Sequence, residues 1–138
     1  MVPARLRNRA VVVAVGATAN WFEAAAPIVR AAAEVDAPTA GGPLSVVFFG
    51  LFTPLQGSTV IGRALRLLHE RGTAVRATLI GSGQDAEAVH QDVDGLPSVT
   101  WVDWVDADEL PAVVAGHDVC LGIFGTTEKA LRVVPNKV

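Results

Sequence analysis

The chain has 138 residues, of which 51% are apolar and 18% are charged, and its net charge is -3. This composition fits one folded domain with an apolar core, and it excludes a disordered tail and a broad basic face for nucleic acid. No apolar run reaches the roughly 18 residues of a membrane span, and the single Cys120 fits a reducing compartment, so we expect a cytoplasmic protein without a transmembrane segment.

Residues 1–43 are expected to form an interdomain crossover or linker segment that contains one short strand. The β-branched run at residues 11–15 predicts that strand. Residues 21–35 are rich in Ala and favour a helix, but we expect Pro27 to interrupt it. Residues 36–43 have the Pro and Gly content of a linker.

From residue 44 onward, apolar strands and amphipathic helices alternate with short loops between them. Strands are expected at residues 44–49, 74–80, 99–102 and 119–121, and helices at residues 58–71, 85–91 and 106–116. This alternation predicts an α/β fold in which residues 44–138 form a Rossmann-like, doubly wound parallel sheet. Residues 135–138 resemble the first turn of a helix, so we expect the natural polypeptide to continue beyond Val138 and this domain to be truncated.

Two of the expected helices begin with capping signals. Ser58 is predicted to cap the first of them, and residues 106–109 resemble a capping box that starts the last. The apolar positions of the Ser58 helix follow the spacing of one buried face, and they are Ile61, Ala64, Leu65 and Leu68.

Glycine-containing loops follow the first two expected strands. Residues 50–57 link a strand to a helix, where backbone N–H groups and the helix dipole favour a pyrophosphate; an ordinary strand-to-helix turn has the same features. Residues 81–86 read G-x-G-x-x-A, the dinucleotide fingerprint, and Asp103 lies at the distance from it where that fold places an acid. NAD binding, one wall of another nucleotide site and a plain tight turn all agree with this second motif.

Charged side chains offer two further candidate sites. Lys129, Arg132 and Lys137 would offset the charge of a departing diphosphate, although cations in a loop also commonly face solvent. The pairs at residues 92–94 and 106–108 imitate an Asp-x-Asp metal motif. We interpret them as a polar loop and a helix start, and we expect no metal site.

Four motifs follow one another along the second part of the chain. They are VFFGLFTPLQG at residues 47–57, LIGSG at 79–83, VTWVDWV with DELP at 99–111, and AGHDVCLGIFG with KA and RVVPNK at 115–137. In this order and spacing they resemble the C-terminal, donor-binding domain of family-four (group 1) glycosyltransferases of GT-B fold.

The resemblance implies a retaining, hexosyltransferase-type enzyme that transfers a sugar from a nucleoside diphosphate sugar, with no metal or further cofactor. It also implies that an N-terminal domain outside this chain holds an acceptor glycan or lipid, and that this chain alone is inactive. Leu51 stands where the family commonly has Arg, and Arg132 takes the place of the first Glu of its Glu-x7-Glu pair. The catalytic residues therefore stay unassigned.

The same resemblance implies which residues bind the donor, and Trp104 and Val105 are expected to form a wall beside its nucleobase. The expected donor and phosphate contacts are Gly50, Phe52, Thr53, Gln56, Gly57, Gly81, Gly83, Lys129, Arg132 and Lys137. Two other interpretations stay open. One is a free-standing Rossmann-like module that binds NAD through the Gly81 loop, and the other is a non-catalytic truncated remnant without a ligand.

Overall fold

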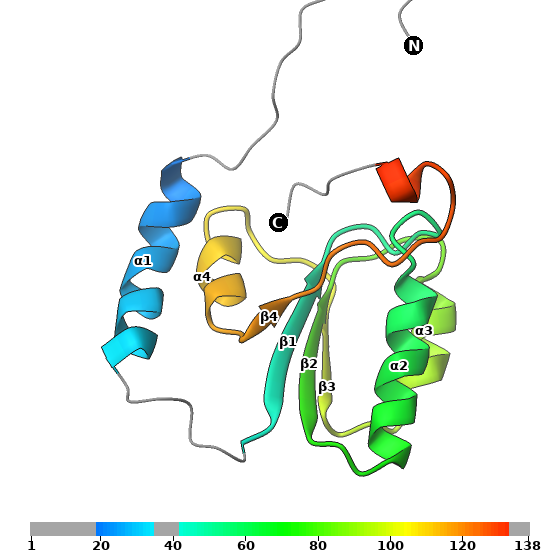
Figure 1. Ribbon diagram of the computed structural model, residues 1–138. Coiled ribbons are helices and arrows are strands. Elements are labelled where there is room, and N and C mark those ends of the chain that lie inside the picture. Colours follow the sequence, from blue (N-terminus) through cyan, green and yellow to red (C-terminus); the bar gives the residue numbers. More distant parts are fainter. Residues whose placement is uncertain (1–18, 35–41, 133–138) are drawn as a thin grey trace, which may run out of the picture.

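The computed structural model describes residues 19–34 and 42–132 (Figure 1). Helices and strands alternate along the chain, as the sequence predicts. The elements are α1 (Ala19–Glu34), β1 (Leu44–Phe49), α2 (Ser58–Glu70), β2 (Val75–Ile80), α3 (Ala86–Val93), β3 (Val99–Val102), α4 (Leu110–Ala115), β4 (Val119–Cys120) and a 3-10 helix, Ala130–Arg132. The strand predicted at residues 11–15 and the expected phosphate ligand Lys137 lie outside the described residues.

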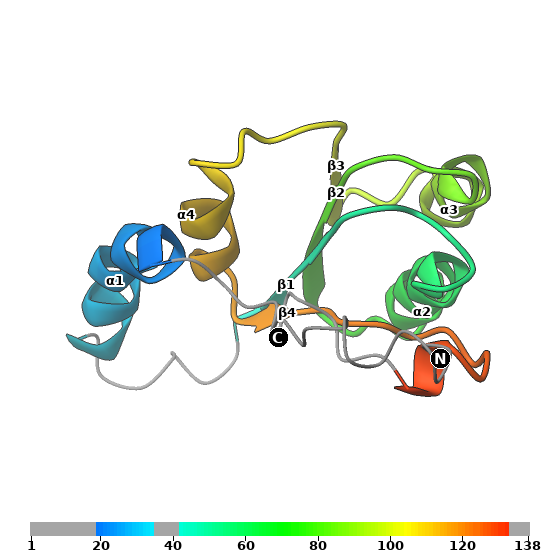
Figure 2. The same cartoon turned by 90° about the horizontal axis from the view of Figure 1, so that it is seen from above.

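The four strands form one parallel sheet in the order β3-β2-β1-β4. Helices α2 and α3 cover one face of this sheet, while α4 lies on the other face with α1 beside it (Figures 1 and 2). Helices on both faces of a parallel sheet define the doubly wound, Rossmann-like class. The predicted fold class is therefore confirmed.

The core lies between the sheet and helices α2 and α3. Alternate residues of β1 and β2, among them Phe48 and Leu79, point to this side and are fully buried. Ile61 and Leu65 of α2 and Val89 of α3 pack against them. Strand alternation and helical spacing thus place the apolar side chains in one shared layer.

Helices α2 and α3 approach closely because Gly62 lacks a side chain. A Cβ atom on Gly62 would lie 3.0 Å from the Cβ of Asp92 and 3.3 Å from Cγ1 of Val89. Arg66 then ties the two helices together, since it donates hydrogen bonds to the backbone oxygens of Asp92 (2.8 Å) and Asp94 (2.5 Å). The prediction that Ala64 belongs to the buried face is wrong: Ala64 is exposed and Gly62 is buried in its place.

Both predicted helix caps are wrong in the structure. Gly57, with φ 68°, is the N-cap of α2, and Ser58 lies inside the helix, fully buried, with its hydroxyl donating to Asp85 Oδ2 at 3.4 Å. Helix α4 begins at Leu110, and the carboxylate of Asp106 accepts a hydrogen bond from Trp104 Nε1 at 3.3 Å. In each case another side chain takes the hydrogen bond of the predicted capping group.

Helix α1 is continuous through Pro27, so the predicted interruption there is wrong. A proline removes one backbone donor, and this helix tolerates that loss. Helix α1 packs against α4, and the Trp21 ring stacks on Phe49 of β1 with centroids 5.9 Å apart. Residues 19–34, expected to be part of a crossover segment, therefore pack with α4 on one face of the sheet.

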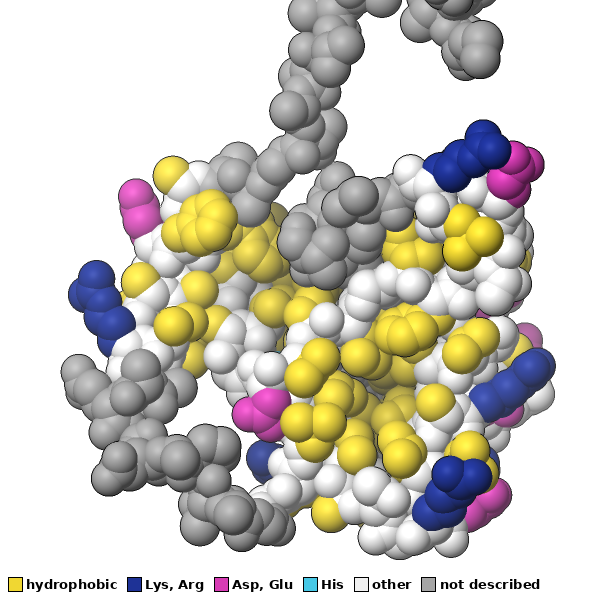
Figure 3. Space-filling view, in the orientation of Figure 1, with side chains coloured by type: hydrophobic (Ala, Val, Ile, Leu, Met, Phe, Trp, Pro, Cys, Tyr) yellow, Lys and Arg dark blue, Asp and Glu magenta, His cyan; other side chains and the backbone are white. Residues whose placement is uncertain are grey.

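Strand β4 is at the end of the sheet, and among the described residues no strand pairs with its outer edge. Apolar side chains gather over β4 and between it and α2 in the space-filling view (Figure 3). Val119 of this strand is 41% exposed. This side of the described domain therefore presents an apolar surface.

Candidate functional site at the carboxyl edge of the sheet

The loops that follow β1, β2 and β3 enclose a cavity of about 320 Å³ at the carboxyl edge of the sheet. Open parallel sheets bind ligands at this edge. The cavity is lined by Phe49, Gly50, Leu51, Ile80, Gly81, Ser82, Asp103, Trp104, Val105, Ala107 and Leu110. We call it the carboxyl-edge cavity.

Gly50 and Gly81 form part of its floor, and each is placed by the sheet. The N–H of Gly50 donates to the Ile80 oxygen at 3.0 Å, and the N–H of Gly81 donates to the Val102 oxygen at 2.9 Å. A Cβ atom on Gly81 would lie only 2.2 Å from the oxygen of Gly50. These glycines thus allow two loops to touch through their backbones, and both amides are used within the fold.

Phe52 and Gly83 hold the same two loops together on the core side of the sheet. The Phe52 ring is 1% exposed and contacts the rings of Phe48 and Trp101, at centroid distances of 5.1 and 4.5 Å. Its N–H donates to Ser82 and its carbonyl accepts from Asp85, both at 3.0 Å. A Cβ atom on Gly83 would meet the Phe52 oxygen at 2.4 Å. In this structure both predicted donor ligands serve loop packing.

A second loop contact covers the start of α2. A Cβ atom on Gly57 would lie 2.4 Å from the amide nitrogen of Gly125, and Phe124 N–H donates to the Gln56 oxygen at 2.9 Å. The Thr53 oxygen accepts from the Gly57 N–H at 3.0 Å. The segment at residues 124–125 therefore packs over Gly57. None of the predicted phosphate residues Thr53, Gln56 and Gly57 lines the carboxyl-edge cavity.

Gln56 has one feature that its sequence position did not signal. Its side-chain oxygen Oε1 is buried and has no hydrogen-bond partner within the described part of the chain. Buried polar atoms are normally hydrogen-bonded, so this unpaired oxygen lowers the stability of the loop between β1 and α2.

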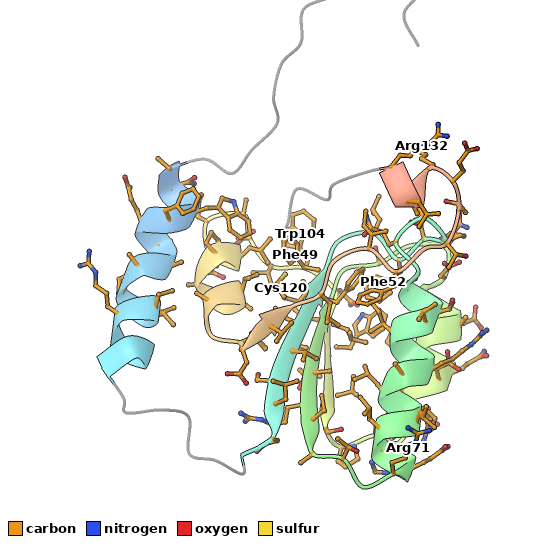
Figure 4. All side chains as sticks on the ribbon, in the orientation of Figure 1. Phe49, Phe52, Arg71, Trp104, Cys120 and Arg132 are labelled. Atoms are coloured by element: carbon orange, nitrogen blue, oxygen red, sulfur yellow. The ribbon has the colours of Figure 1, made fainter. Side chains whose placement is uncertain are left out.

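The predicted cations lie away from the cavity. Arg132 forms an ion pair with Glu128 four residues earlier, and their side chains are 75% and 77% exposed. Lys129 is also exposed. The 3-10 helix that carries Arg132 lies on the α2 side of the sheet, whereas Trp104 lies on the α4 side (Figures 2 and 4). Lys129 and Arg132 are thus not brought together with Gly50 and Gly81.

Trp104 and Val105, the predicted nucleobase wall, do line the carboxyl-edge cavity together with Gly50 and Gly81. Trp104 is 77% exposed, and its indole N–H is directed to Asp106. Asp103 also lines this cavity. The described lining of the cavity contains no Lys or Arg. Apolar and aromatic walls with one carboxylate suit a planar ring and vicinal hydroxyls better than a phosphate.

Sequence reasoning did not identify Leu51, Ala107 and Leu110 as cavity residues. Leu51 is 66% exposed and follows Gly50 in the loop after β1. No group of three His, Cys, Asp or Glu side chains suited to a metal ion occurs among the described residues. None of the described helices combines the length and apolar character needed to cross a membrane.

Comparisons with known proteins find a likeness among solved structures. No family model matches the chain, and no curated protein matches it. A similar solved structure is the C-terminal domain of a glycosyl transferase group 1 family protein (LpcC) from Francisella tularensis, with 21% sequence identity and a TM-score of 0.46. The likeness covers 57% of this chain and 45% of that chain, so the chain spans less than half of the length of that structure.

Proposed function

We propose that this chain is the donor-binding part of a retaining glycosyltransferase and that it binds a nucleoside diphosphate sugar in the carboxyl-edge cavity. The four sequence motifs at residues 47–57, 79–83, 99–111 and 115–137 favour this class of enzyme. One structural observation carries the proposal: Gly50, Gly81 and Trp104 come from three separate loops and line a single cavity.

The composition of the cavity assigns roles within the proposed site. The exposed Trp104 indole, with Val105 beside it, forms a surface on which a nucleobase can stack. Asp103 accepts hydrogen bonds from ribose hydroxyls, as carboxylates in nucleotide sites do. Gly50 and Gly81 present backbone without side chains, so a ligand approaches the sheet closely.

The described lining does not supply the charge that glycosyl transfer needs. A departing diphosphate is stabilised by cations or by several free N–H groups, and the carboxyl-edge cavity contains neither Lys129 nor Arg132. We therefore propose that this chain recognises the nucleoside of the donor and that, on its own, it transfers no sugar. An acceptor glycan or lipid would be bound by another domain.

The test is calorimetric titration of the full chain with UDP-glucose, GDP-mannose and NAD, repeated with W104A. Base–aromatic stacking is worth about 1–3 kcal/mol, so W104A should weaken binding of the preferred nucleotide sugar by roughly 5- to 150-fold. The matched control is F22A, since Phe22 is 69% exposed on α1 and does not line the cavity. Equal affinity in W104A and the parent would contradict the proposed site.

A second candidate function, NAD binding, is favoured by the position of Asp103. This carboxylate follows β3, which pairs with β2, and it lines the same cavity as Gly81. Gly81 and Asp103 thereby occupy the relative positions of the dinucleotide fingerprint and its ribose acid. Tighter binding of NAD than of either nucleotide sugar in the same titration would establish this candidate and overturn the first.

A further inference from the structure

The sheet face toward α4 changes character along the strands. At the carboxyl ends it carries Phe49, Ile80 and Val102, which are apolar. Nearer the amino ends the same face carries polar side chains. Strand register places Ser45 beside Arg76 and Thr78 beside Thr100. Side chains at such paired positions on one face lie within reach of one another.

These polar side chains line a hollow of about 350 Å³. Its polar lining is supplied by Ser45, Arg76, Thr78, Ser98, Thr100 and His117. The hollow is at the opposite end of the strands from the carboxyl-edge cavity and shares no lining residue with it.

His117 is held in a fixed orientation at one side of the hollow. Its Nδ1 donates to the Val113 carbonyl oxygen, and its Nε2 is hydrogen-bonded to Thr78 Oγ1, both at 2.8 Å. The neighbouring carboxylate, Asp118, accepts the Ser45 N–H at 2.7 Å. The acid nearest to His117 in sequence is therefore already bonded to the backbone.

Arg76 supplies the positive charge of the hollow. It is exposed and forms no ion pair with any acid in the described part of the chain. A guanidinium presents a fork of N–H donors that matches two oxygens of a phosphate. Hydroxyls such as Ser98 and Thr100 rotate to donate further hydrogen bonds to the same group.

We propose that this polar hollow binds the phosphate group of a small phosphate monoester. Arg76 contacts two phosphate oxygens, Thr100 and Ser98 donate to the remaining ones, and the fixed His117–Thr78 pair forms the wall beside them. The hollow has room beyond one phosphate group, so the organic part of the monoester lies within it. This site is independent of the nucleotide site proposed above.

The experiment follows backbone amide resonances of the full chain during titration with glycerol phosphate or inorganic phosphate, against sodium chloride at equal ionic strength. Saturable shifts at Thr78, Thr100 and His117, with tighter binding of glycerol phosphate, are expected. Inorganic phosphate binding as tightly as glycerol phosphate would overturn the assignment to a monoester. Shifts centred on Gly81 and Trp104 would place the anion in the carboxyl-edge cavity and overturn the proposal.

Three substitutions distinguish a specific binding site from general charge attraction. R76Q should weaken glycerol phosphate binding roughly tenfold, because a charge-assisted bidentate contact is lost. R63Q removes the same charge from an exposed position on α2 and should leave the affinity unchanged. Equal weakening in both variants would show that only net charge matters and would overturn the proposal. T100V, which keeps the shape of the side chain, should weaken binding less than R76Q but measurably.

Discussion

The two faces of the sheet differ in how they are built and in what they offer a ligand. The face toward α2 and α3 is a closed apolar layer, in which Phe48 and Leu79 are fully buried and Gly62 lets the helices approach. The face toward α4 carries both the carboxyl-edge cavity and the polar hollow. The closed apolar layer therefore lies on one face of the strands, and both cavities lie on the other.

This difference follows from strand alternation. Successive side chains of a strand point to opposite faces, so Phe48 enters the core while its neighbour Phe49 lines the cavity. The same holds for Leu79 and Ile80 on β2. A substitution at the fully buried Phe48 should affect folding, whereas one at the half-buried Phe49 should affect binding.

The largest expected effect tests the closed face. F48A removes a fully buried ring that contacts Phe52, and loss of such a ring costs about 3–5 kcal/mol. Chemical denaturation should show this loss of unfolding free energy. The control L51A shortens a side chain that is 66% exposed beside the cavity, and its effect should stay within about 0.5 kcal/mol. Similar losses in both variants would contradict the division between the faces.

The next largest effect tests the contact between the Gly50 and Gly81 loops, which line the carboxyl-edge cavity. G81A places a Cβ atom 2.2 Å from the Gly50 oxygen at a residue with φ 119°, so the backbone must shift and about 2–3 kcal/mol should be lost. The matched control is G72A, where φ is 67° and no atom lies within 4 Å of the added Cβ. Its cost should be the left-handed strain alone, about 1 kcal/mol.

Thermal unfolding of the two glycine variants, followed by circular dichroism, measures this difference. If G72A were as destabilising as G81A, the close approach of the Gly50 and Gly81 loops would not contribute to stability. The Gly81 motif would then need another explanation, such as direct ligand contact.

The sequence predicted the strands well because their signal is local. Apolar β-branched runs between turn residues placed β1 and β3 at the observed residues. The helix caps were missed because other side chains compete for the capping groups: Ser58 donates to Asp85, 27 positions away, and Trp104 donates to the carboxylate of Asp106. Local pattern alone does not report such competition.

The candidate site was predictable only in part, for the same reason. The family resemblance predicted Trp104 and Val105 as part of the site. They line one cavity with Gly50 and Gly81 because the carboxyl ends of parallel strands meet at one edge. The meaning of the glycines was ambiguous, since Gly83 is required by contact with Phe52, which lies in a different loop. Sequence spacing cannot distinguish a glycine that admits a ligand from one that admits another loop.

The smallest expected effect decides whether the predicted cation Arg132 belongs to the site. Its ion pair with Glu128 is exposed, and exposed pairs of this kind contribute about 0–1 kcal/mol. R132Q should therefore leave unfolding free energy within about 0.5 kcal/mol of the parent. Because Arg132 lies on the α2 side of the sheet and the cavity lies on the α4 side, nucleotide-sugar affinity should also stay unchanged (Figure 4). E128Q removes the other half of the pair and controls for its loss. If R132Q weakened binding while E128Q did not, Arg132 would contact the diphosphate, and the site would extend across the edge of the sheet.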